Sequence, residues 1–376
     1  MRTTYLLLFF LFSSPALGFD VPIPGTGPIA GTSHILVDFQ SQQTIVEKNA
    51  DERLEPASIT KLMTAYIVFS ELSKGSIALD DRVSVSEKAY RMDGSRMFIE
   101  PNKPVTVEEL LLGMIIQSGN DASVALAEHV AGTEASFAEL MNHYGRQLGL
   151  DNSNFVNSTG WPHEDHYSTA RDIATLAAAL IRDFPQYYDW YSQRVYKYNG
   201  IEQYNRNTLL GRDDSVDGIK TGHTNSAGYC LASSAIRDGR RLIAVVLGTD
   251  SKRQRADASY SLLNYGFRHF ETHTLYEAGK PLTSARVWKG SEKEVTLGID
   301  RDLHVTIPRG SYDSLEANMD LQATLVAPLQ TSDELGSVRV NLGDQVLAEA
   351  TLRPLTEIST GGIVRRAIDE VMLWFE

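Results

Sequence analysis

The sequence predicts a mixed α/β (α+β) domain, followed by a small all-β sandwich domain and a C-terminal amphipathic helix. Three observations lead to this fold class. Up to about residue 273, apolar runs of helical length alternate with short strand-like runs. Beyond that point the helical periods end, and short alternating runs are separated by Gly, Pro and Asp turns, as in a β-sandwich. Residues 363–376 place their apolar side chains, except that of Leu373, on one half of a helical wheel.

The chain of 376 residues is too long for one compact core and indicates two domains, which an apolar fraction of 42% can fill. We expect a signal peptide at residues 1–18, a first domain at 19–273, a β-sandwich at 274–357 and an anchor helix at 358–376. The net charge of −13 argues against a general affinity for nucleic acid, which requires a basic surface. It also gives the body of the protein no attraction to an anionic membrane.

Cys230 is the single cysteine, so no internal disulfide can form and stability must come from packing. We expect it to be buried and inert in a strand, between Tyr229 and Leu231.

The N-terminus predicts export. Arg2 precedes the apolar run 5–12, and small residues follow at 13–18, where a signal peptidase would need them. The run is too short to span a bilayer as a helix. We therefore expect a cleaved signal peptide, with the mature chain starting at or near Phe19.

The first half of the first domain begins with strands at 33–39 and 44–47 around a polar turn, after a Pro/Gly-rich linker. A helix is expected from Ser58 to about residue 73, because apolar residues recur along it. A capping box at 106–109 opens a second apolar helix that is stopped at 118–120. A further helix should begin at about Asp121.

The second half of this domain continues with helices at 135–148 and 171–181, separated by a loop at 152–167. Strand-type runs follow at 227–234 and 242–248, and a helix at about 255–267 closes the domain. In the β-rich part, strands are expected at 286–288, 294–297, 303–307, 322–326 and 337–342. No catalytic constellation lies among them, which favours a spacer or docking module.

A hydroxyl and an amine stand three residues apart where the first helix should begin, at Ser58 and Lys61. Residues i and i+3 share one face of a helix, so the two side chains should meet. A serine becomes a strong nucleophile when a neighbouring base takes its proton. Lys61 could be that base if burial or a second cation lowered its pKa by roughly three units. The alternative is a serine that caps a helix and a lysine in solvent.

Two other fragments could supply partners for this pair. Ser118-Gly119-Asn120 presents a serine and an asparagine on a tight turn between two buried helices, although a helix stop followed by an N-cap gives the same pattern. Residues 217–223 carry Lys220, Thr221 and Gly222 on a strand whose small residues would let an extended peptide approach. The alternative for Lys220 is a strand lysine that faces solvent.

The order Ser58-x-x-Lys61, Ser118-x-Asn120 and Lys220-Thr221-Gly222 resembles the signature of the penicillin-binding protein and serine β-lactamase superfamily. Within it, the chain is similar to the low-molecular-mass penicillin-binding proteins, the serine-type D-alanyl-D-alanine carboxypeptidases of peptidase family S11. This similarity rests on residues 55–61, 217–224 and 306–310, and extends over nearly the whole mature chain. It implies a transpeptidase-like catalytic domain, a β-sandwich and a terminal anchor.

The resemblance implies that Ser58 attacks the carbonyl between the two terminal D-alanines of a peptidoglycan stem peptide and forms an acyl-enzyme. Lys61 would be the general base, and Ser118 would relay a proton to the leaving amine. Water would hydrolyse the acyl-enzyme, with Lys61 as base again. The implied chemistry requires no metal and no organic cofactor.

Substrate binding is implied for a second set of residues. Asn120 would hold the substrate amide, and Lys220, Thr221 and Gly222 would line the site near the terminal carboxylate. The backbone N–H groups of Ser58 and His223 would form the oxyanion hole. Arg255 is a further candidate for the carboxylate, although Arg253 lies two residues away.

Three other functions stay open at this point. A class A β-lactamase would have Asp in place of Gly119 and a deacylating E-x-x-x-N motif, whereas the loop 152–167 offers only Glu164. β-Lactams should therefore act as covalent inhibitors that leave Ser58 slowly. Cross-link endopeptidase activity is a second possibility. A non-catalytic wall-binding protein is a third, although it need not retain Ser58, Lys61, Ser118 and Lys220.

The C-terminal helix predicts peripheral attachment to a membrane. Its apolar half ends in Trp374 and Phe375, and a Gly361-Gly362 hinge precedes it. Two arginines against three acidic residues give little attraction to anionic lipid, and docking on its own domain is the alternative. With the signal peptide, the helix predicts an exported protein on the periplasmic face of the inner membrane.

Overall fold

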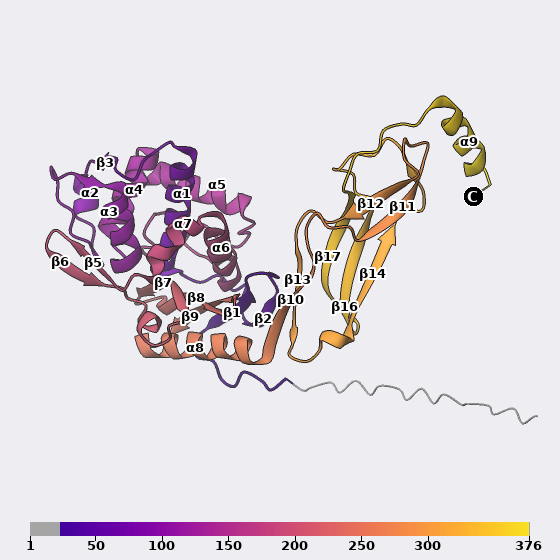
Figure 1. Cartoon of the computed structure of the whole chain (residues 1–376). Helices are drawn as coiled ribbons and strands as arrows, with labels where there is room; N and C mark the ends of the chain where they lie inside the picture. Colours follow the sequence, from indigo (N-terminus) through magenta and orange to yellow (C-terminus); the bar gives the residue numbers. More distant parts are fainter. Residues whose placement is uncertain (1–22, 376) are drawn as a thin grey trace, which may run out of the picture.

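The computed structural model describes residues 23–375, so the predicted signal peptide lies outside the described residues. The described chain forms two parts that follow one another in sequence, a mixed α/β part and a β-rich part, with a helix at the end (Figure 1). The predicted fold class is confirmed.

The first part is built on a five-stranded antiparallel sheet with the strand order β2-β1-β9-β8-β7. Its strands are β1 (Ser33–Asp38), β2 (Thr44–Lys48), β7 (Val216–Thr224), β8 (Gly228–Arg237) and β9 (Arg240–Thr249). Cys230 lies buried in β8, as expected. β7 is an edge strand of this sheet, and it carries the Lys220-Thr221-Gly222 fragment.

The two faces of the sheet pack against different helices because side chains alternate along each strand. In β9, Ile243 and Val245 belong to one apolar cluster, and Leu242 and Val246 belong to the other. The second cluster is closed by α8 (Lys252–His269), which runs beneath the sheet in Figure 1. The first face is covered by the other helices of this part.

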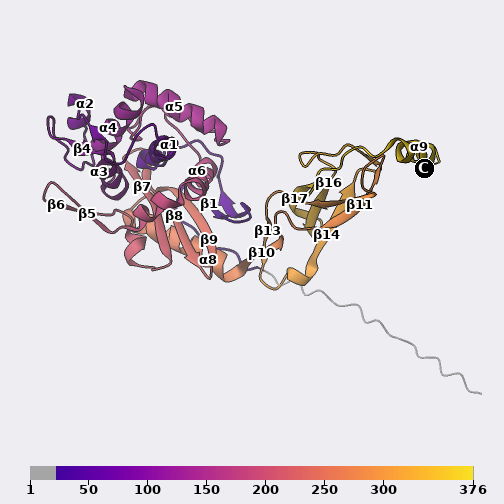
Figure 2. The same ribbon diagram turned by 45° about the horizontal axis from the view of Figure 1, so that its top comes forward.

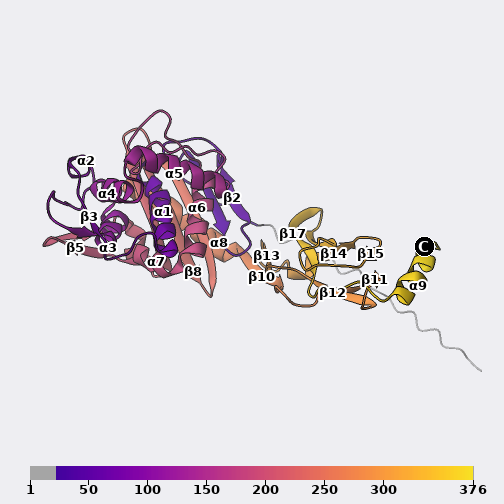
Figure 3. The same ribbon diagram turned by 90° about the horizontal axis from the view of Figure 1, so that it is seen from above.

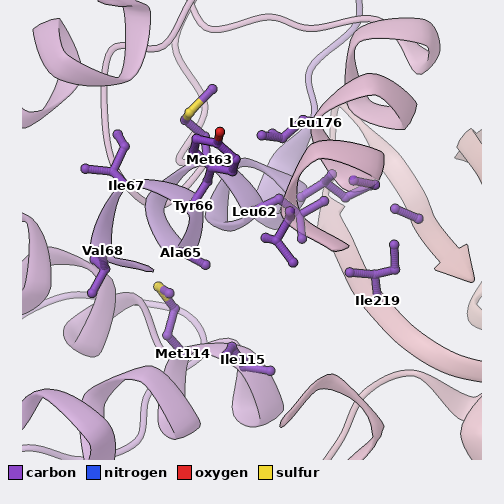
Figure 4. Packing of buried hydrophobic residues seen from close by; sticks show 14 of the residues in the cluster. Leu62, Met63, Ala65, Tyr66, Ile67, Val68, Met114, Ile115, Leu176 and Ile219 are labelled. Carbon is purple, nitrogen blue, oxygen red and sulfur yellow. The ribbon is translucent and has the colours of Figure 1, made fainter. Parts of the chain in front are cut away.

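Those helices enclose a large core around α1 (Lys61–Lys74). Figure 4 shows Met114 and Ile115 on the side of α1 that carries Ala65 and Val68. The surrounding helices are α2 (Glu87–Tyr90), α3 (Val107–Leu112), α4 (Asn120–Ala131), α5 (Glu134–Gln147), α6 (Ala170–Asp183) and α7 (Pro185–Tyr188). Burial on every side makes α1 a rigid support for the turn that precedes it.

A short strand pair, a β-hairpin and a loop flank this helical layer. β3 (Arg82–Val83) pairs with β4 (Val105–Thr106), and β5 (Val195–Tyr198) pairs with β6 (Ile201–Tyr204). The predicted capping box is present at the start of α3, where Thr106 and Glu109 exchange hydrogen bonds. Between α2 and β4, residues 93–99 have no regular structure.

The β-rich part contains a six-stranded sheet with the order β14-β16-β17-β12-β11-β15, and a separate β10–β13 pair. Leu303 and Val305 of β13 pack with Val338 and Val340 of β16 in one apolar cluster. The strands are β10 (Phe270–Tyr276), β11 (Thr283–Trp288), β12 (Glu294–Gly298), β13 (Leu303–Pro308), β14 (Leu315–Leu321), β15 (Leu325–Val326), β16 (Gly336–Leu342) and β17 (Gln345–Pro354). The predicted strand at 322–326 is wrong in its first half, since only Leu325–Val326 pair.

A partly buried polar network connects the two parts. The Asp38 carboxylate accepts hydrogen bonds from Arg240 Nε at 2.8 Å and from Thr272 Oγ1 at 2.6 Å. Thr306 Oγ1 lies 2.6 Å from Ser41 Oγ and 2.9 Å from Thr272 Oγ1. β10 and β13 lie between the central sheet and the six-stranded sheet (Figure 2). β10 spans the expected domain boundary at residues 273 and 274.

The terminal helix α9 (Ile363–Leu373) lies at one end of the molecule, and the β5–β6 hairpin lies at the other (Figures 1 and 3). Within residues 23–375, no helix combines the length and apolar character needed to cross a bilayer.

Candidate active site

Ser58 lies in a 3₁₀ turn, Ala57–Thr60, immediately before α1. Ala57 has a φ of 49°, in the left-handed region that a residue with a side chain rarely adopts. Lys61 is the first residue of α1, so the predicted proximity of the two side chains is achieved across the junction between the turn and the helix. The Lys61 amine lies 3.0 Å from Ser58 Oγ.

The amine of Lys61 is enclosed by oxygen atoms. Its Nζ lies 2.7 Å from Asn120 Oδ1 and 2.7 Å from the Thr159 carbonyl, and the residue is 1% exposed. The pKa of Lys61 is lowered to about 7, mainly by burial; the charge of Asp121 opposes this shift, the cation Arg206 contributes to it, and Glu134 opposes it. The amine can therefore exchange a proton with Ser58 near neutral pH.

Ser118 and Asn120 approach this pair from the turn between α3 and α4. A π-helical turn, Gly113–Gln117, ends at Ser118, whose φ of 67° turns the chain sharply before α4 begins at Asn120. The Lys220 amine on β7 donates to Ser118 Oγ at 2.8 Å. Asn120 also donates from Nδ2 to the Asp93 carbonyl at 2.7 Å, which fixes its amide.

Lys220 is the second buried amine of the site. Burial holds the pKa of Lys220 well below its usual value, and the charges of Lys61, Arg206 and Arg255 act in the same direction. Two amines and two guanidinium groups thus surround Ser58 and Ser118. Such a site favours an anionic ligand and disfavours full protonation of both lysines.

Two glycines bring backbone segments against the serine turn. A Cβ atom at Gly222 would lie 2.8 Å from the Pro56 carbonyl oxygen, so only glycine lets β7 approach this closely. A Cβ atom at Gly160, which has a φ of 79°, would lie 1.8 Å from the carbonyl oxygen of Ala57. The turn is therefore held between the edge strand and residues 157–160.

Arg255 on α8 is buried and reaches the same edge strand. Its guanidinium donates to the carbonyls of Gly222 at 3.0 Å, Cys230 at 3.4 Å and Arg206 at 3.4 Å. Burial lowers its pKa to about 10. Within residues 23–375 it has no carboxylate partner, whereas the exposed Arg253 pairs with Asp257. Of the two arginines, only Arg255 lines a cavity at Ser58.

Ser58 and His223 line two cavities that meet at the serine. The first, of about 590 Å³, also contains Asn120 and Trp161. The second, of about 460 Å³, also contains Ser118, Thr221, Gly222, Lys252 and Arg255. Seven of the nine residues singled out from the sequence therefore line these two cavities. Lys61 contacts Ser58, and Lys220 contacts Ser118.

Several residues of the site were missed by the sequence analysis. Arg206 lines both cavities and donates to the Gln117 carbonyl at 3.0 Å. Asp121 is buried and accepts from the backbone N–H groups of Met97 at 3.0 Å and Phe98 at 2.8 Å. No motif surrounds Arg206, but Asp121 follows Asn120 directly and could have been considered for that reason.

Among the described residues, no acidic side chain lines the two cavities at Ser58, as the deacylating glutamate of a class A β-lactamase would. Glu164 is exposed on its loop. Glu134 is buried, but its carboxylate accepts from Ser158 N at 2.9 Å and from Ser158 Oγ at 2.7 Å, and it pairs with Lys88. Neither residue lines the two cavities at Ser58.

Comparison with known proteins finds a matching family for each of the two parts of the chain. Residues 22–251 match the D-alanyl-D-alanine carboxypeptidase family, peptidase S11, and residues 270–360 match the C-terminal domain of penicillin-binding protein 5. The chain is 39% identical over 383 residues to D-alanyl-D-alanine carboxypeptidase DacA of Escherichia coli strain K12, covering 99% of this chain and 95% of that protein. It is 40% identical over 374 residues to DacC of the same strain, covering 97% and 93%.

A solved structure extends the similarity to three dimensions. Penicillin-binding protein 5 from Haemophilus influenzae superposes with a TM-score of 0.85 at 40% identity, covering 88% of this chain and 98% of that chain. The matched families, the near-complete coverage and the buried Ser58–Lys61 pair agree with one another. The chain therefore belongs to the serine-type D-alanyl-D-alanine carboxypeptidases of peptidase family S11.

Proposed function

We propose that this carboxypeptidase releases the terminal D-alanine of peptidoglycan stem peptides through an acyl-enzyme on Ser58. The observation that carries the proposal is the Lys61 amine, which is buried, has a pKa of about 7 and lies 3.0 Å from Ser58 Oγ. In its neutral form this amine accepts the proton of Ser58 as the hydroxyl attacks the scissile carbonyl.

The proton then has a short path to the leaving group. Ser118 Oγ faces the same cavity as Ser58 and is hydrogen-bonded to the amine of Lys220. Ser118 donates to the amine of the departing D-alanine and is reprotonated through Lys220 or Lys61. The bond from the carbonyl carbon to this amine breaks as the new ester bond to Ser58 forms. Water subsequently hydrolyses the ester, with Lys61 again as base.

The charges of the two cavities orient the substrate. The cavity lined by Thr221, Lys252 and Arg255 receives the terminal carboxylate, because its cations lack a carboxylate partner there. The cavity lined by Asn120 and Trp161 then holds the remainder of the peptide. The backbone N–H groups of Ser58 and His223 bind the developing oxyanion, each contributing about 3 kcal/mol to catalysis.

β-Lactams react with the same serine in this proposal. A relative, penicillin-binding protein D2 from Listeria monocytogenes, has been solved with ampicillin bound, at 27% identity and with a TM-score of 0.59. Without a carboxylate to activate water at the acyl-enzyme, the penicilloyl ester on Ser58 should be long-lived. This long-lived ester would separate the protein from a class A β-lactamase.

A direct assay tests the peptidase activity. Free D-alanine is measured after incubation with a stem pentapeptide, beside Ser58→Ala. We expect D-alanine from the wild type and none above background from Ser58→Ala. Release at the same rate by Ser58→Ala would refute the acyl-enzyme on this residue.

We propose a separate role for each domain. Residues 19–273 carry catalysis, residues 274–357 act as a spacer, and residues 358–376 attach the exported protein to the periplasmic face of the inner membrane. Trp374 and Phe375 support this attachment, since they are 84% and 87% exposed. An exposed apolar face of this kind suits the interface of a bilayer.

The polar face of α9 is turned toward the protein. Asp369 accepts from the backbone N–H of Lys289 at 2.6 Å, and Arg365 donates to the carbonyls of Ser291 at 3.0 Å and Glu292 at 2.6 Å. Lys289 also pairs with Glu370. Two of the acidic residues of the helix are thus engaged by the β11–β12 hairpin, while the apolar face stays available for lipid.

Sedimentation tests the membrane proposal. A chain that ends before Gly361 should remain in the supernatant, while the full mature chain should sediment with inner-membrane vesicles. Sedimentation of the shortened chain with the vesicles would refute attachment through α9.

A further inference from the structure

The neutral amine of Lys61 has one lone pair, and its hydrogen-bond partners determine the direction of that lone pair. Loss of one proton from the ammonium leaves two N–H groups. Asn120 Oδ1 and the Thr159 carbonyl, each 2.7 Å from the amine, can only accept hydrogen bonds, so they take these two groups. The lone pair is then left for Ser58 Oγ at 3.0 Å. The inference below rests on the proposed function, in which this lone pair takes the proton of Ser58.

The two acceptors are held in place by different means. The amide of Asn120 is fixed because its Nδ2 donates to the Asp93 carbonyl at 2.7 Å. The Thr159 carbonyl belongs to a stretch, residues 155–160, that is neither helix nor strand. Its position therefore depends on the hydrogen bonds made by the neighbouring residues.

Ser158, the residue before Thr159, is fully buried and uses all of its polar groups inside the protein. Its carbonyl accepts from Thr64 Oγ1 and from Ser123 Oγ, each at 2.7 Å. Its backbone N–H and its hydroxyl both donate to the Glu134 carboxylate, at 2.9 Å and 2.7 Å. Glu134 thus accepts both of the hydrogen bonds that Ser158 donates.

Glu134 is well placed to remain an ionised acceptor. It is the first residue of α5, where the helix N-terminus favours a carboxylate, and it is 8% exposed. Its second oxygen pairs with the amine of Lys88 on α2 at 2.7 Å. Burial alone would raise the pKa of Glu134, but the hydrogen bonds from Lys88 and Ser158 outweigh burial and lower it. Hydrogen bonds to an ionised acceptor are stronger than those between neutral groups.

We infer that Glu134 is a positioning residue of the reaction, which acts through Ser158 to hold the Thr159 carbonyl where it directs the Lys61 lone pair at Ser58. Glu134 does not line either cavity at Ser58, so it has no contact with a ligand bound there. Its loss should therefore slow the transfer of the serine proton and leave the binding of the ligand unchanged.

Two substitutions separate the reach of this side chain from its charge. Glu134→Asp keeps the carboxylate but is shorter by one methylene group, so it cannot hold Ser158 at the present distances. Glu134→Gln keeps the length and an oxygen acceptor for Ser158 but removes the charge. Glu139, an exposed acid on the same helix, supplies the matched controls Glu139→Asp and Glu139→Gln.

Acylation by a fluorescent penicillin is followed at varied penicillin concentration and pH. The data give the dissociation constant of the noncovalent complex, the acylation rate constant and the inflection of its pH profile. Rate constants refer to the fraction of protein that becomes acylated at the end point, so inactive protein does not enter them. The unfolding temperature of each variant is measured as well.

In Glu134→Asp we expect the acylation rate constant at the high-pH plateau to fall roughly tenfold, with an unchanged dissociation constant and inflection. Glu134→Gln should keep the plateau and shift the inflection to lower pH, because the Glu134 carboxylate raises the pKa of Lys61. Both Glu139 variants should match the wild type. Ser158→Ala, which loses only the hydroxyl contact with Glu134, should lower the plateau by a smaller factor, and it supplies the same test if Glu134→Asp does not fold.

An unchanged plateau in Glu134→Asp, even with a lower unfolding temperature, would assign Glu134 to stability alone and overturn the inference. An equal fall of the plateau in Glu134→Gln would overturn it too, as would weaker binding with an unchanged rate constant. A wild type that forms no adduct on Ser58 would instead overturn the proposed function itself.

Discussion

Burial lowers the pKa of Lys61 and so allows its amine to act as a base. The same amine in water has a pKa of about 10.4 and is almost fully protonated at neutral pH. Enclosure by Ser58, Asn120 and the Thr159 carbonyl removes water and lowers the pKa to about 7. The neighbouring Lys220 is lowered too, so the two amines titrate as a coupled pair.

The rate of acylation of Ser58 should depend on pH. Because the neutral amine of Lys61 is the base, the second-order rate of acylation by a fluorescent penicillin should rise with pH and level off above an inflection near pH 7. Below the inflection the rate should fall about tenfold per pH unit. A rate that is constant between pH 5 and pH 9 would exclude Lys61 as the base.

Substitutions of two charged neighbours of Lys61 should move this inflection in opposite directions. Arg206 lowers the pKa of Lys61, so Arg206→Gln should shift the inflection to higher pH. Asp121 raises the pKa of Lys61, so Asp121→Asn should shift the inflection to lower pH. The position of the inflection is compared, since it does not depend on how much active protein each variant yields. Shifts of the same sign in both variants would contradict this electrostatic account.

The sequence could predict the residues that carry the chemistry, but only part of their surroundings. Ser58, Lys61, Ser118 and Lys220 lie in short fragments whose order in the chain is informative. Arg206 and the Thr159 carbonyl belong to no such fragment, since only the tertiary fold brings them to Lys61. A backbone carbonyl also leaves no trace in the residue type, so its role could be found only from coordinates.

At the scale of secondary-structure elements, the serine turn depends on close contacts that only glycine permits. Gly160 and Gly149 both have a positive φ, of 79° and 73°, but only Gly160 faces another backbone atom within 4 Å. Each alanine substitution should cost about 1–2 kcal/mol for the left-handed conformation. In Gly160→Ala, the new Cβ atom would also displace Ala57, the residue directly before Ser58.

We therefore predict that Gly160→Ala slows acylation by penicillin roughly 10²-fold, as a misplacement of about 1 Å can do. Gly149→Ala should lower the unfolding temperature with little change in acylation. Thermal unfolding and acylation rates of the two purified variants give the comparison. Equal acylation by both variants would show that the contact with Ala57 does not position Ser58.

The helices and strands that bury apolar side chains were predicted best from the sequence. The long helices α1, α5, α6 and α8 were predicted to within a few residues, because they bury many apolar side chains, whereas the four-residue helices α2 and α7 were missed. β14 was missed, since it is an exposed edge strand containing Asn318 and Asp320, which are poor strand formers. Its partner β16 was found because Val338 and Val340 alternate toward a core.

At the scale of the whole molecule, the catalytic part and α9 lie at opposite ends of an elongated chain (Figure 3). The polar network of Asp38, Arg240 and Thr272 connects the two parts through partly buried hydrogen bonds. Because α9 is hydrogen-bonded to the β11–β12 hairpin, attachment to a bilayer would also fix the β-rich part relative to the membrane. The distance from α9 to Ser58 would then set the height at which stem peptides are processed.

This docking of α9 predicts a measurable change in its protection. Asp369→Ala removes the acceptor for the Lys289 N–H, so amide hydrogen exchange in α9 should become faster in the absence of membranes. Arg366→Ala is the matched control, because Arg366 is an exposed residue of the same helix. Unchanged exchange in Asp369→Ala would mean that the helix is not held by this contact.

Intact-mass spectrometry of the mature protein with benzylpenicillin can detect the acyl-enzyme on Ser58. Ser58→Ala is run in parallel, and D-alanine release from a pentapeptide is assayed on the same samples. We expect a persistent one-to-one penicilloyl adduct that is absent from Ser58→Ala, together with D-alanine release by the wild type. Rapid penicillin turnover without a lasting adduct, or an adduct that persists in Ser58→Ala, would contradict this expectation.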